Sequence, residues 1–145
     1  MAEGDPVAYN SFKKGLLDGT FDLVNDTLKL TLHTGYTPDI DSHTQRSHVS
    51  ATEYSTADGY TANGKTISGG VNSQDNSNDR GKFDATDVTW TALGALTPAT
   101  PSHAILWDDT AANDELIAYW ELGSTATNGG DYTIQWSSNG IILVN

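Results

Sequence analysis

The last third of the chain restricts the possible folds more than any other part. Four segments there, 102–109, 115–123, 131–137 and 140–144, are rich in β-branched and aromatic residues. Stretches of small, polar and glycine residues separate them, and this is the composition of loops and tight turns. The succession predicts four short strands joined by turns.

A fifth strand is predicted over residues 27–34 (TLKLTLHT). Leucine stands at every second position, and lysine, threonine and histidine stand between the leucines. A period of two is typical of a strand with one buried and one solvated face, as in an antiparallel sheet. We therefore expect Leu28, Leu30 and Leu32 to be buried and the opposite face to be wet.

The N-terminal end divides into an arm and a helix. Residues 1–8 contain few apolar side chains and are predicted to form a flexible arm, followed by one domain over 9–145. Residues 10–17 can form a short helix with Asn10 or Ser11 as its N-cap. Gly19 is well placed to end that helix.

The rest of the chain predicts further short strands and no long helix. A single helical turn is expected over 41–48, and a two-residue hairpin turn at Asn63-Gly64. Eight or nine short strands exclude an α/β fold and leave an antiparallel sandwich of the jelly-roll type or a small barrel. The additional three or four strands are expected among the segments 49–54, 59–62, 65–71, 81–84 and 88–91.

The core is expected to collect the inward-facing residues of these strands. Its predicted members are Leu28, Leu30, Leu32, Ile105, Trp107, Ile117, Ile134, Trp136 and Ile142.

The charge balance restricts the partners of the protein. Nineteen acidic residues and seven basic residues give a net charge of −12. Binding to nucleic acid depends on lysine and arginine that neutralise phosphates, so direct binding to DNA or RNA is not expected. No apolar run is long enough to span a bilayer and no leader is recognisable, so no membrane partner is expected. There is no cysteine, and hence no disulfide framework.

Two acidic segments invite a metal-binding interpretation. Asp39, Asp41 and His43 would point the same way on an extended segment, but a hard cation needs several more oxygen ligands, so capping of local turns is the better interpretation. The segment 75–79 begins like a calcium loop, yet Arg80 takes the place of the required glycine. We therefore expect an exposed hairpin tip there, and no bound metal or cofactor.

Catalytic signatures are weak. Asp84, Asp87, Asp108 and Asp109 could supply a carboxylate pair for glycoside hydrolysis, but aspartate at strand ends is ordinary turn chemistry. The four histidines are scattered, and no serine stands in a nucleophile motif. The chain is therefore not expected to be an enzyme.

Four tryptophans, at positions 90, 107, 120 and 136, lie on predicted strands. Exposed tryptophans could stack on sugars or anchor an interface, whereas buried ones fill the space between two sheets. Val88 and Ile134 share the faces of their neighbouring tryptophans, which favours burial. We expect three of the four in the core. Because Tyr119 and Trp120 are adjacent, one of that pair must lie outside the core or under a loop.

Several stretches of the chain resemble a family of small virion proteins of tailed bacteriophages, which includes capsid decoration (cement) proteins. The stretches that carry the resemblance are 9–19 (YNSFKKGLLDG), 36–41 (YTPDID), 82–90 (KFDATDVTW), 104–109 (AILWDD) and 132–141 (YTIQWSSNGI). The resemblance implies a sandwich fold, and with it we select the jelly-roll type. It also implies a structural protein on the outside of the phage head that clamps neighbouring subunits of the major capsid protein. The alternative is a head or tail fibre or adhesin module that recognises a host glycan, with a site formed by the loops at 35–50 and 92–101.

The decoration interpretation predicts an interface. Symmetric sites on a lattice imply a homodimer or homotrimer over a local axis. We expect capsid contact through residues 1–17, with a second contribution from the loop at 35–50. The predicted contact residues are Tyr9, Phe12, Lys13, Lys14 and Leu16, in which apolar burial supplies most of the affinity and the lysines match capsid carboxylates. The competing interpretation is that the short helix simply closes one end of the sandwich.

Overall fold

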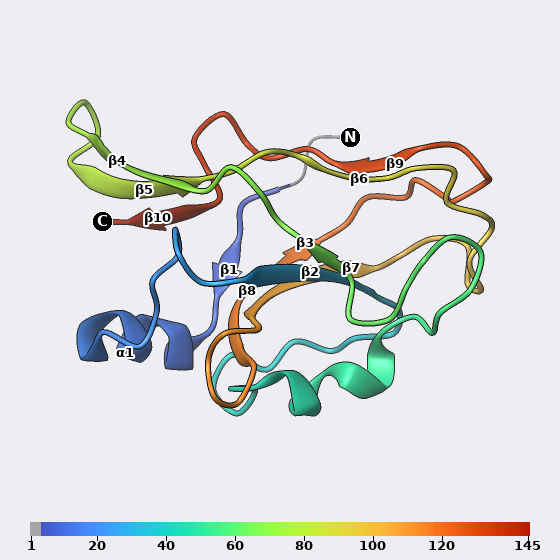
Figure 1. Cartoon of the computed structure of the whole chain (residues 1–145), viewed down its shortest axis with the longest axis horizontal. Coiled ribbons are helices and arrows are strands. Elements are labelled where there is room, and N and C mark those ends of the chain that lie inside the picture. The colour runs from blue at the N-terminus through green and yellow to red at the C-terminus, as the bar shows by residue number, and fades with distance from the viewer. Residues whose placement is uncertain (1–3) are drawn as a thin grey trace.

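The chain folds around a five-stranded antiparallel sheet with the strand order β1-β8-β7-β2-β3, seen in the lower half of Figure 1. A computed structural model describes residues 4–145; the first three residues of the predicted arm lie outside this range. The strands of this sheet are β1 (Val7–Ala8), β2 (Leu28–His33), β3 (Lys65–Thr66), β7 (His103–Asp108) and β8 (Glu115–Glu121).

The centre of the sheet is the antiparallel set β2, β7 and β8. Leu30 lies opposite Leu106, and Leu106 lies opposite Ala118, so apolar side chains meet across both pairs. The pairing of β7 with β8 shifts by one residue between Leu106 and Trp107, a bulge that changes which residues face each side. The strands predicted over 27–34, 102–109 and 115–123 are thus confirmed.

A second layer lies above this sheet in Figure 1. It consists of a three-stranded sheet, β10-β5-β4, and a two-stranded pair, β6-β9, all antiparallel. Its strands are β4 (Val71–Asp75), β5 (Arg80–Asp84), β6 (Val88–Trp90), β9 (Tyr132–Ile134) and β10 (Ile142–Val144). The expected all-β, antiparallel architecture is therefore confirmed.

The main core fills the space between the two layers, and every predicted core residue is buried. Ile105 and Trp107, however, belong to a smaller cluster on the opposite, outer face of the five-stranded sheet. Thr31 and His33 are buried on that face as well, so the expectation that this face of β2 is wet was wrong. The reason is that residues 34–53 fold back over it: Thr34 donates to the Thr52 carbonyl, and β2 is covered on both sides.

The covering segment is irregular. The strand predicted over 49–54 is instead part of a pair of 3-10 helices, Arg46–His48 and Ser50–Thr52. Asn63 and Gly64 do form a tight turn, with φ of 79° and 69°. The strand that follows, β3, pairs with β2 and not with residues 59–62, so the predicted local hairpin was wrong.

The one α-helix within residues 4–145, α1 (Asn10–Asp18), lies at one end of the molecule, at the lower left of Figure 1. Gly19, in the left-handed conformation with φ of 73°, ends it and donates to the Gly15 carbonyl, as expected. Its N-cap is Tyr9 and not Asn10 or Ser11. The last two residues of the predicted arm form β1, paired with β8, so that end of the arm is part of the sheet. In the described residues, no helix is long and apolar enough to cross a bilayer.

Candidate interaction surface

The predicted contact residues on α1 divide into a buried and an exposed set. Tyr9 and Phe12 are fully buried: the Tyr9 hydroxyl is 2.7 Å from the Tyr36 hydroxyl, and the Phe12 ring packs edge-on against Phe21 at 4.9 Å. Burial raises the pKa of Tyr9, so its hydroxyl stays protonated. These two side chains already serve the fold of the protein itself, and so their apolar surface is not open to a partner.

The exposed set carries less free charge than the sequence implies. Lys14 forms an ion pair with Asp18 one turn later, and that hydrogen bond raises the Lys14 pKa. Lys13 donates to the Asn10 side chain at 3.3 Å. Of the adjacent lysines, only Lys13 lacks a carboxylate partner within residues 4–145.

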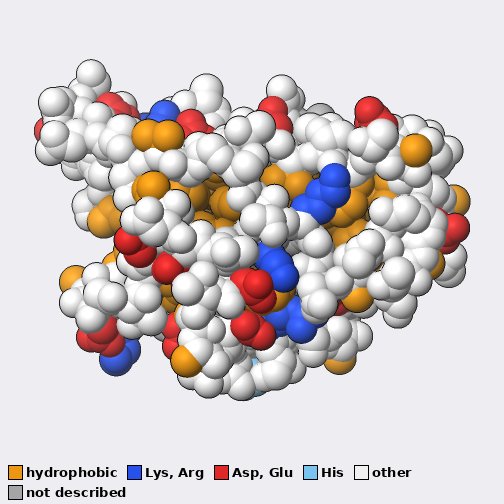
Figure 2. Space-filling model, viewed as in Figure 1, with side chains coloured by type: hydrophobic (Ala, Val, Ile, Leu, Met, Phe, Trp, Pro, Cys, Tyr) orange, Lys and Arg blue, Asp and Glu red, His pale blue; other side chains and the backbone are white. Residues whose placement is uncertain are grey.

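Leu16 borders a groove between α1 and the three-stranded sheet. The groove has a volume of about 470 Å³ and is mainly apolar in character. Figure 2 shows apolar side chains gathered in this part of the molecule, between the region that carries β5 and β10 and the region that carries α1. The apolar residues that line the groove are Leu16, Phe21, Leu23, Phe83, Ile142 and Val144.

One exposed apolar side chain belongs to the groove. Of the five large apolar side chains that are exposed in residues 4–145, Val144 on β10 lines it and is 51% exposed. Leu17 and Val24 are also exposed, and they follow the groove residues Leu16 and Leu23 in the sequence. Single exposed apolar residues are ordinary, but an apolar hollow on the surface is typical of an interaction site.

The suspected metal ligands have local structural roles. The Asp39 carboxylate accepts from the backbone N–H groups of Asp41 and Ser42, and these bonds lower its pKa. Asp41 accepts from Asn10, and His43 Nδ1 lies 3.0 Å from the Tyr36 hydroxyl. Within residues 4–145 no three His, Cys, Asp or Glu side chains are grouped so that they could hold a metal ion. Turn capping by Asp39, the preferred interpretation, is confirmed.

The failed calcium loop is the tip of the β4–β5 hairpin. Asp75 pairs with Arg80 at 2.8 Å and accepts from the Asn78 side chain. These contacts close the turn and lower the Asp75 pKa.

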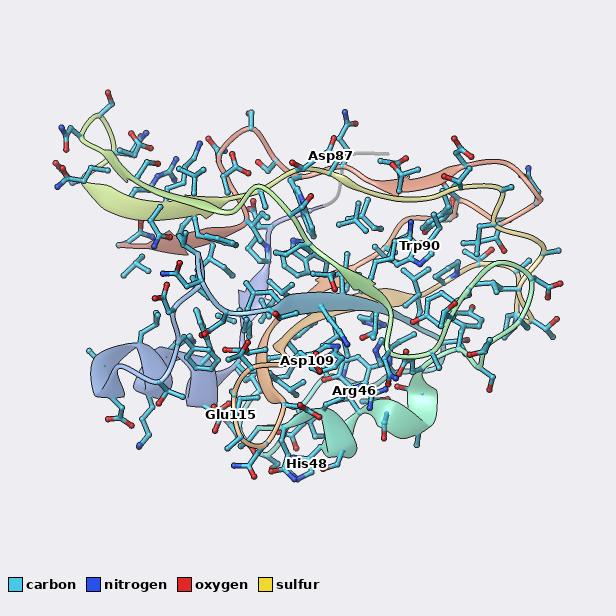
Figure 3. All side chains as sticks on the ribbon, viewed as in Figure 1. Arg46, His48, Asp87, Trp90, Asp109 and Glu115 are labelled. Carbon is cyan, nitrogen blue, oxygen red and sulfur yellow. The ribbon has the colours of Figure 1, made fainter. Side chains whose placement is uncertain are left out.

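The carboxylates considered for catalysis are dispersed. Figure 3 shows Asp87 in the upper layer and Asp109 in the lower layer. Asp87 accepts from the Trp136 backbone, Asp109 pairs with Lys29, and Asp84 lies 3.6 Å from Lys82.

Asp108 differs from the other carboxylates because it is fully buried. It caps a turn by accepting from the backbone N–H groups of Thr110 and Ala111. Desolvation, together with the neighbouring Asp26 carboxyl, raises its pKa to about 6. These contacts give Asp108 a structural role in the turn at the end of β7.

All four tryptophans are buried, one more than expected. Trp90, Trp120 and Trp136 lie in the main core, and Trp107 lies in the outer cluster, where Arg46 stands 5.0 Å above its ring. Tyr119 is the member of the adjacent pair that leaves the main core, and it packs in the outer cluster. None of the four tryptophans presents a ring on the surface for sugar stacking.

The loop at 35–50 contributes chiefly to that outer cluster. Tyr36 and Val49 are buried against the sheet. Arg46 pairs with Glu53 at 2.5 Å, which links the loop to the edge of β2. Figure 3 shows Arg46 and His48 on this lower side of the molecule, on the opposite side of the five-stranded sheet from Trp90.

Comparisons with known proteins identify no relative: no family model, curated protein or solved structure matches this chain.

Sequence reasoning identified Leu16 but missed Phe21, Ile142 and Val144 as parts of the same surface. Ile142 was assigned to the core, where it is indeed buried, yet it also lines the groove. The available signal was the composition of 140–144 (GIILV): the segment, which contains β10, has no charged residue, and this is unusual for a strand at a sheet edge.

Proposed function

We propose that this protein is a structural virion protein of a tailed bacteriophage, of the capsid decoration or cement type. It binds the outside of the head, with the major capsid protein as its partner, and acts as a homodimer or homotrimer without catalytic activity. The family resemblance of the sequence supports this proposal, and so does an architecture of two antiparallel layers. A jelly-roll type of sandwich is part of the same proposal.

The observation that carries the proposal is the apolar groove between α1 and β10. The protein has a net charge of −12, yet six apolar side chains line one hollow, and Val144 among them is 51% exposed. A surface with this composition gains free energy when it is covered, at about 25 cal/mol per Å² of apolar area removed from water. We infer that a binding partner covers this groove.

Decoration works through many modest contacts. A protein repeated over a capsid lattice gains avidity because each bound copy holds its neighbours in place, so no single contact needs to be strong. The acidic surface has a compatible role: it repels the packaged nucleic acid and keeps unassembled copies apart.

Copy number in purified virions tests the proposal. In particles of the phage that encodes the chain, we expect it at hundreds of copies, comparable with the major capsid protein, and accessible to antibody on intact heads. Tens of copies confined to fibres would support the adhesin alternative. Absence from the particles would overturn both.

A further inference from the structure

Strand β10 is an unprotected sheet edge. It pairs with β5 on one side, and within residues 4–145 no strand pairs with its other side. Its residues, Ile142, Leu143 and Val144, are apolar and uncharged. The opposite edge of the same sheet, β4, is protected by a polar sequence, VNSQD. Proteins usually protect edge strands with charges, prolines or bulges because a bare edge is a template for another strand.

Two hollows adjoin this edge. One is the apolar groove, lined by Ile142 and Val144 together with Leu16 of α1. The other is a hollow of about 340 Å³, lined by Leu143, Asn145 and also Ile142, which borders both hollows. The remaining walls of that second hollow are more polar and consist of Asp5, Pro6, Ala8, Arg80 and Asn139. A strand added at β10 would direct alternate side chains to opposite faces, and these hollows provide room for them.

Gly81 deepens the apolar groove. It lies within β5, opposite Val144, and lines the groove. A Cβ at this position would meet nothing closer than Val144, at 3.9 Å, so steric exclusion of a side chain does not explain the glycine. A glycine inside a strand often marks the place where another chain approaches closely.

We propose that the free edge of β10 binds one extended segment of the partner protein by strand addition. The segment places small apolar side chains in the groove beside Leu16 and neutral or basic side chains in the second hollow. If the proposed function holds, this segment belongs to the major capsid protein. Backbone hydrogen bonds provide affinity in this mode of recognition, and the alternate side chains provide specificity.

The geometry favours a single segment over a second copy of the chain. Leu16 of α1 lines the same groove as Val144, so α1 forms the wall that faces β10. In a second copy β10 is backed by β5 and β4, so a second copy would bring a whole sheet, and not one strand, to the edge that α1 borders. The net charge also disfavours a second copy, because two chains that each carry a net charge of −12 repel each other.

Charge also indicates the chemistry of the segment. Near the edge, Arg80 and Lys82 are paired with Asp75 and Asp84. Asp5 has no ion-pair partner within residues 4–145. The unneutralised charge in the second hollow is therefore negative, which favours lysine or arginine in the segment.

The test is titration of the full chain with a capped peptide of alternating valine and lysine, (Val-Lys)3, followed by NMR. We expect chemical-shift changes and slowed amide exchange over 142–144. The same peptide N-methylated at every residue has no backbone N–H to donate to β10 and is expected not to bind. A peptide that binds equally well with or without N-methylation would overturn strand addition.

Matched variants locate the site. Val144→Lys places a charge on the β10 edge, and Gly81→Val puts a side chain into the groove at a position where the Cβ meets no atom closer than 3.9 Å. Each should weaken peptide binding at least about tenfold while the fold is retained, which the circular dichroism spectrum checks. Val71→Lys is the control, because Val71 is 57% exposed on the opposite edge strand, β4. Equal affinity in all three variants would overturn the assignment.

Two further outcomes separate this inference from the proposed function. Dimerisation through β10, detected by light scattering and abolished by Val144→Lys, would show that a second copy is the occupant and overturn the single-segment proposal. Full capsid occupancy by Val144→Lys and Gly81→Val would overturn the β10 site and leave the decoration function standing. Absence of the wild-type chain from virions would instead overturn the decoration function, while the peptide titration still decides whether β10 accepts a strand.

Discussion

The two faces of the five-stranded sheet are stabilised in different ways. On the inner face, Leu28, Leu30 and Leu32 pack with Trp90 and Trp120 in a core of almost entirely apolar side chains. On the outer face, the buried side chains include hydroxyl and imidazole groups joined by hydrogen bonds. They form two hydrogen-bonded sets, one of Thr31, His33 and Thr52 and one of Tyr9, Tyr36 and His43.

The two faces differ because different kinds of segment pack against them. The inner face meets a second sheet, and close apolar packing is sufficient there. The outer face meets an irregular segment whose own polar groups need partners, because a buried polar group without a hydrogen bond is costly. Stability on the inner face should therefore depend on side-chain volume, and stability on the outer face should depend on hydrogen-bond geometry and on pH.

The largest expected effect is on the inner face. Trp90 is buried and stacks with Tyr60 at 6.2 Å between ring centroids. Trp90→Ala should lower the free energy of unfolding by roughly 3–5 kcal/mol, because it removes a large apolar side chain and leaves a cavity. Urea denaturation measures the change. A loss under about 1 kcal/mol would show that the inner core can collapse around the gap, against its description as closely packed.

The next effect is the pH dependence due to His33. Burial, and secondarily the charges of Arg46 and His103, lowers its pKa to about 3 from the ordinary 6.5. The unfolded chain therefore binds a proton below pH 6.5 that the folded state excludes. Above pH 6.5 this contribution to the free energy of unfolding is fully present. It is lost as the pH falls towards 3, and the loss amounts to roughly 3 kcal/mol at pH 4.

The variant His33→Gln isolates that contribution. It should flatten the slope of unfolding free energy against pH between 4 and 6.5, whatever its effect at pH 7. Thermal unfolding of both proteins at several pH values provides the comparison. Parallel curves would mean that His33 does not govern the acid sensitivity of the outer face.

A smaller effect is expected where the two faces meet. Glu53, almost fully buried, pairs with Arg46 above Trp107 and accepts from the Tyr60 hydroxyl of the inner core. Glu53→Gln should cost about 2 kcal/mol, because Arg46 loses its counter-ion in a mostly buried position.

The exposed pair of Lys14 and Asp18 is the control for that measurement. Asp18→Asn should cost under about 0.5 kcal/mol, since an exposed pair one helical turn apart contributes little. Similar losses in Glu53→Gln and Asp18→Asn would show that burial does not strengthen the Arg46 pair.

On the outer face, the smallest expected effect is on the hydrogen bonds of the tyrosine hydroxyls. Tyr36→Phe removes one oxygen that lies 2.7 Å from the Tyr9 hydroxyl and 3.0 Å from His43. We expect a loss of about 1 kcal/mol, with the ring packing unchanged. Calorimetric unfolding checks the value. An unchanged stability would mean that water or another group replaces the missing hydroxyl.

Local patterns in the sequence identified much of the fold. Alternation marked β2, and β-branched and aromatic segments between turn residues marked β7, β8, β9 and β10. Gly19 marked the end of α1, because glycine adopts the left-handed conformation without a steric penalty. The same patterns rejected a calcium loop at the tip that Asp75 and Arg80 close. Each of these features depends on residues that are close in the sequence, and so the sequence could reveal them.

The candidate surface depended on tertiary structure. Tyr9 and Phe12 resemble interface residues in sequence, but Tyr9 is buried in the outer cluster with Tyr36 and Tyr119, and Phe12 is buried in the main core. His33 looked solvated because an alternating pattern does not reveal whether a distant segment covers the polar face. The groove at β10 likewise forms only because α1 and β5, more than sixty residues apart in the chain, border it from opposite sides. The sequence by itself determined which segments become strands, whereas contacts between distant segments decided which faces are buried, because burial depends on what packs against a strand and not only on the residues within it.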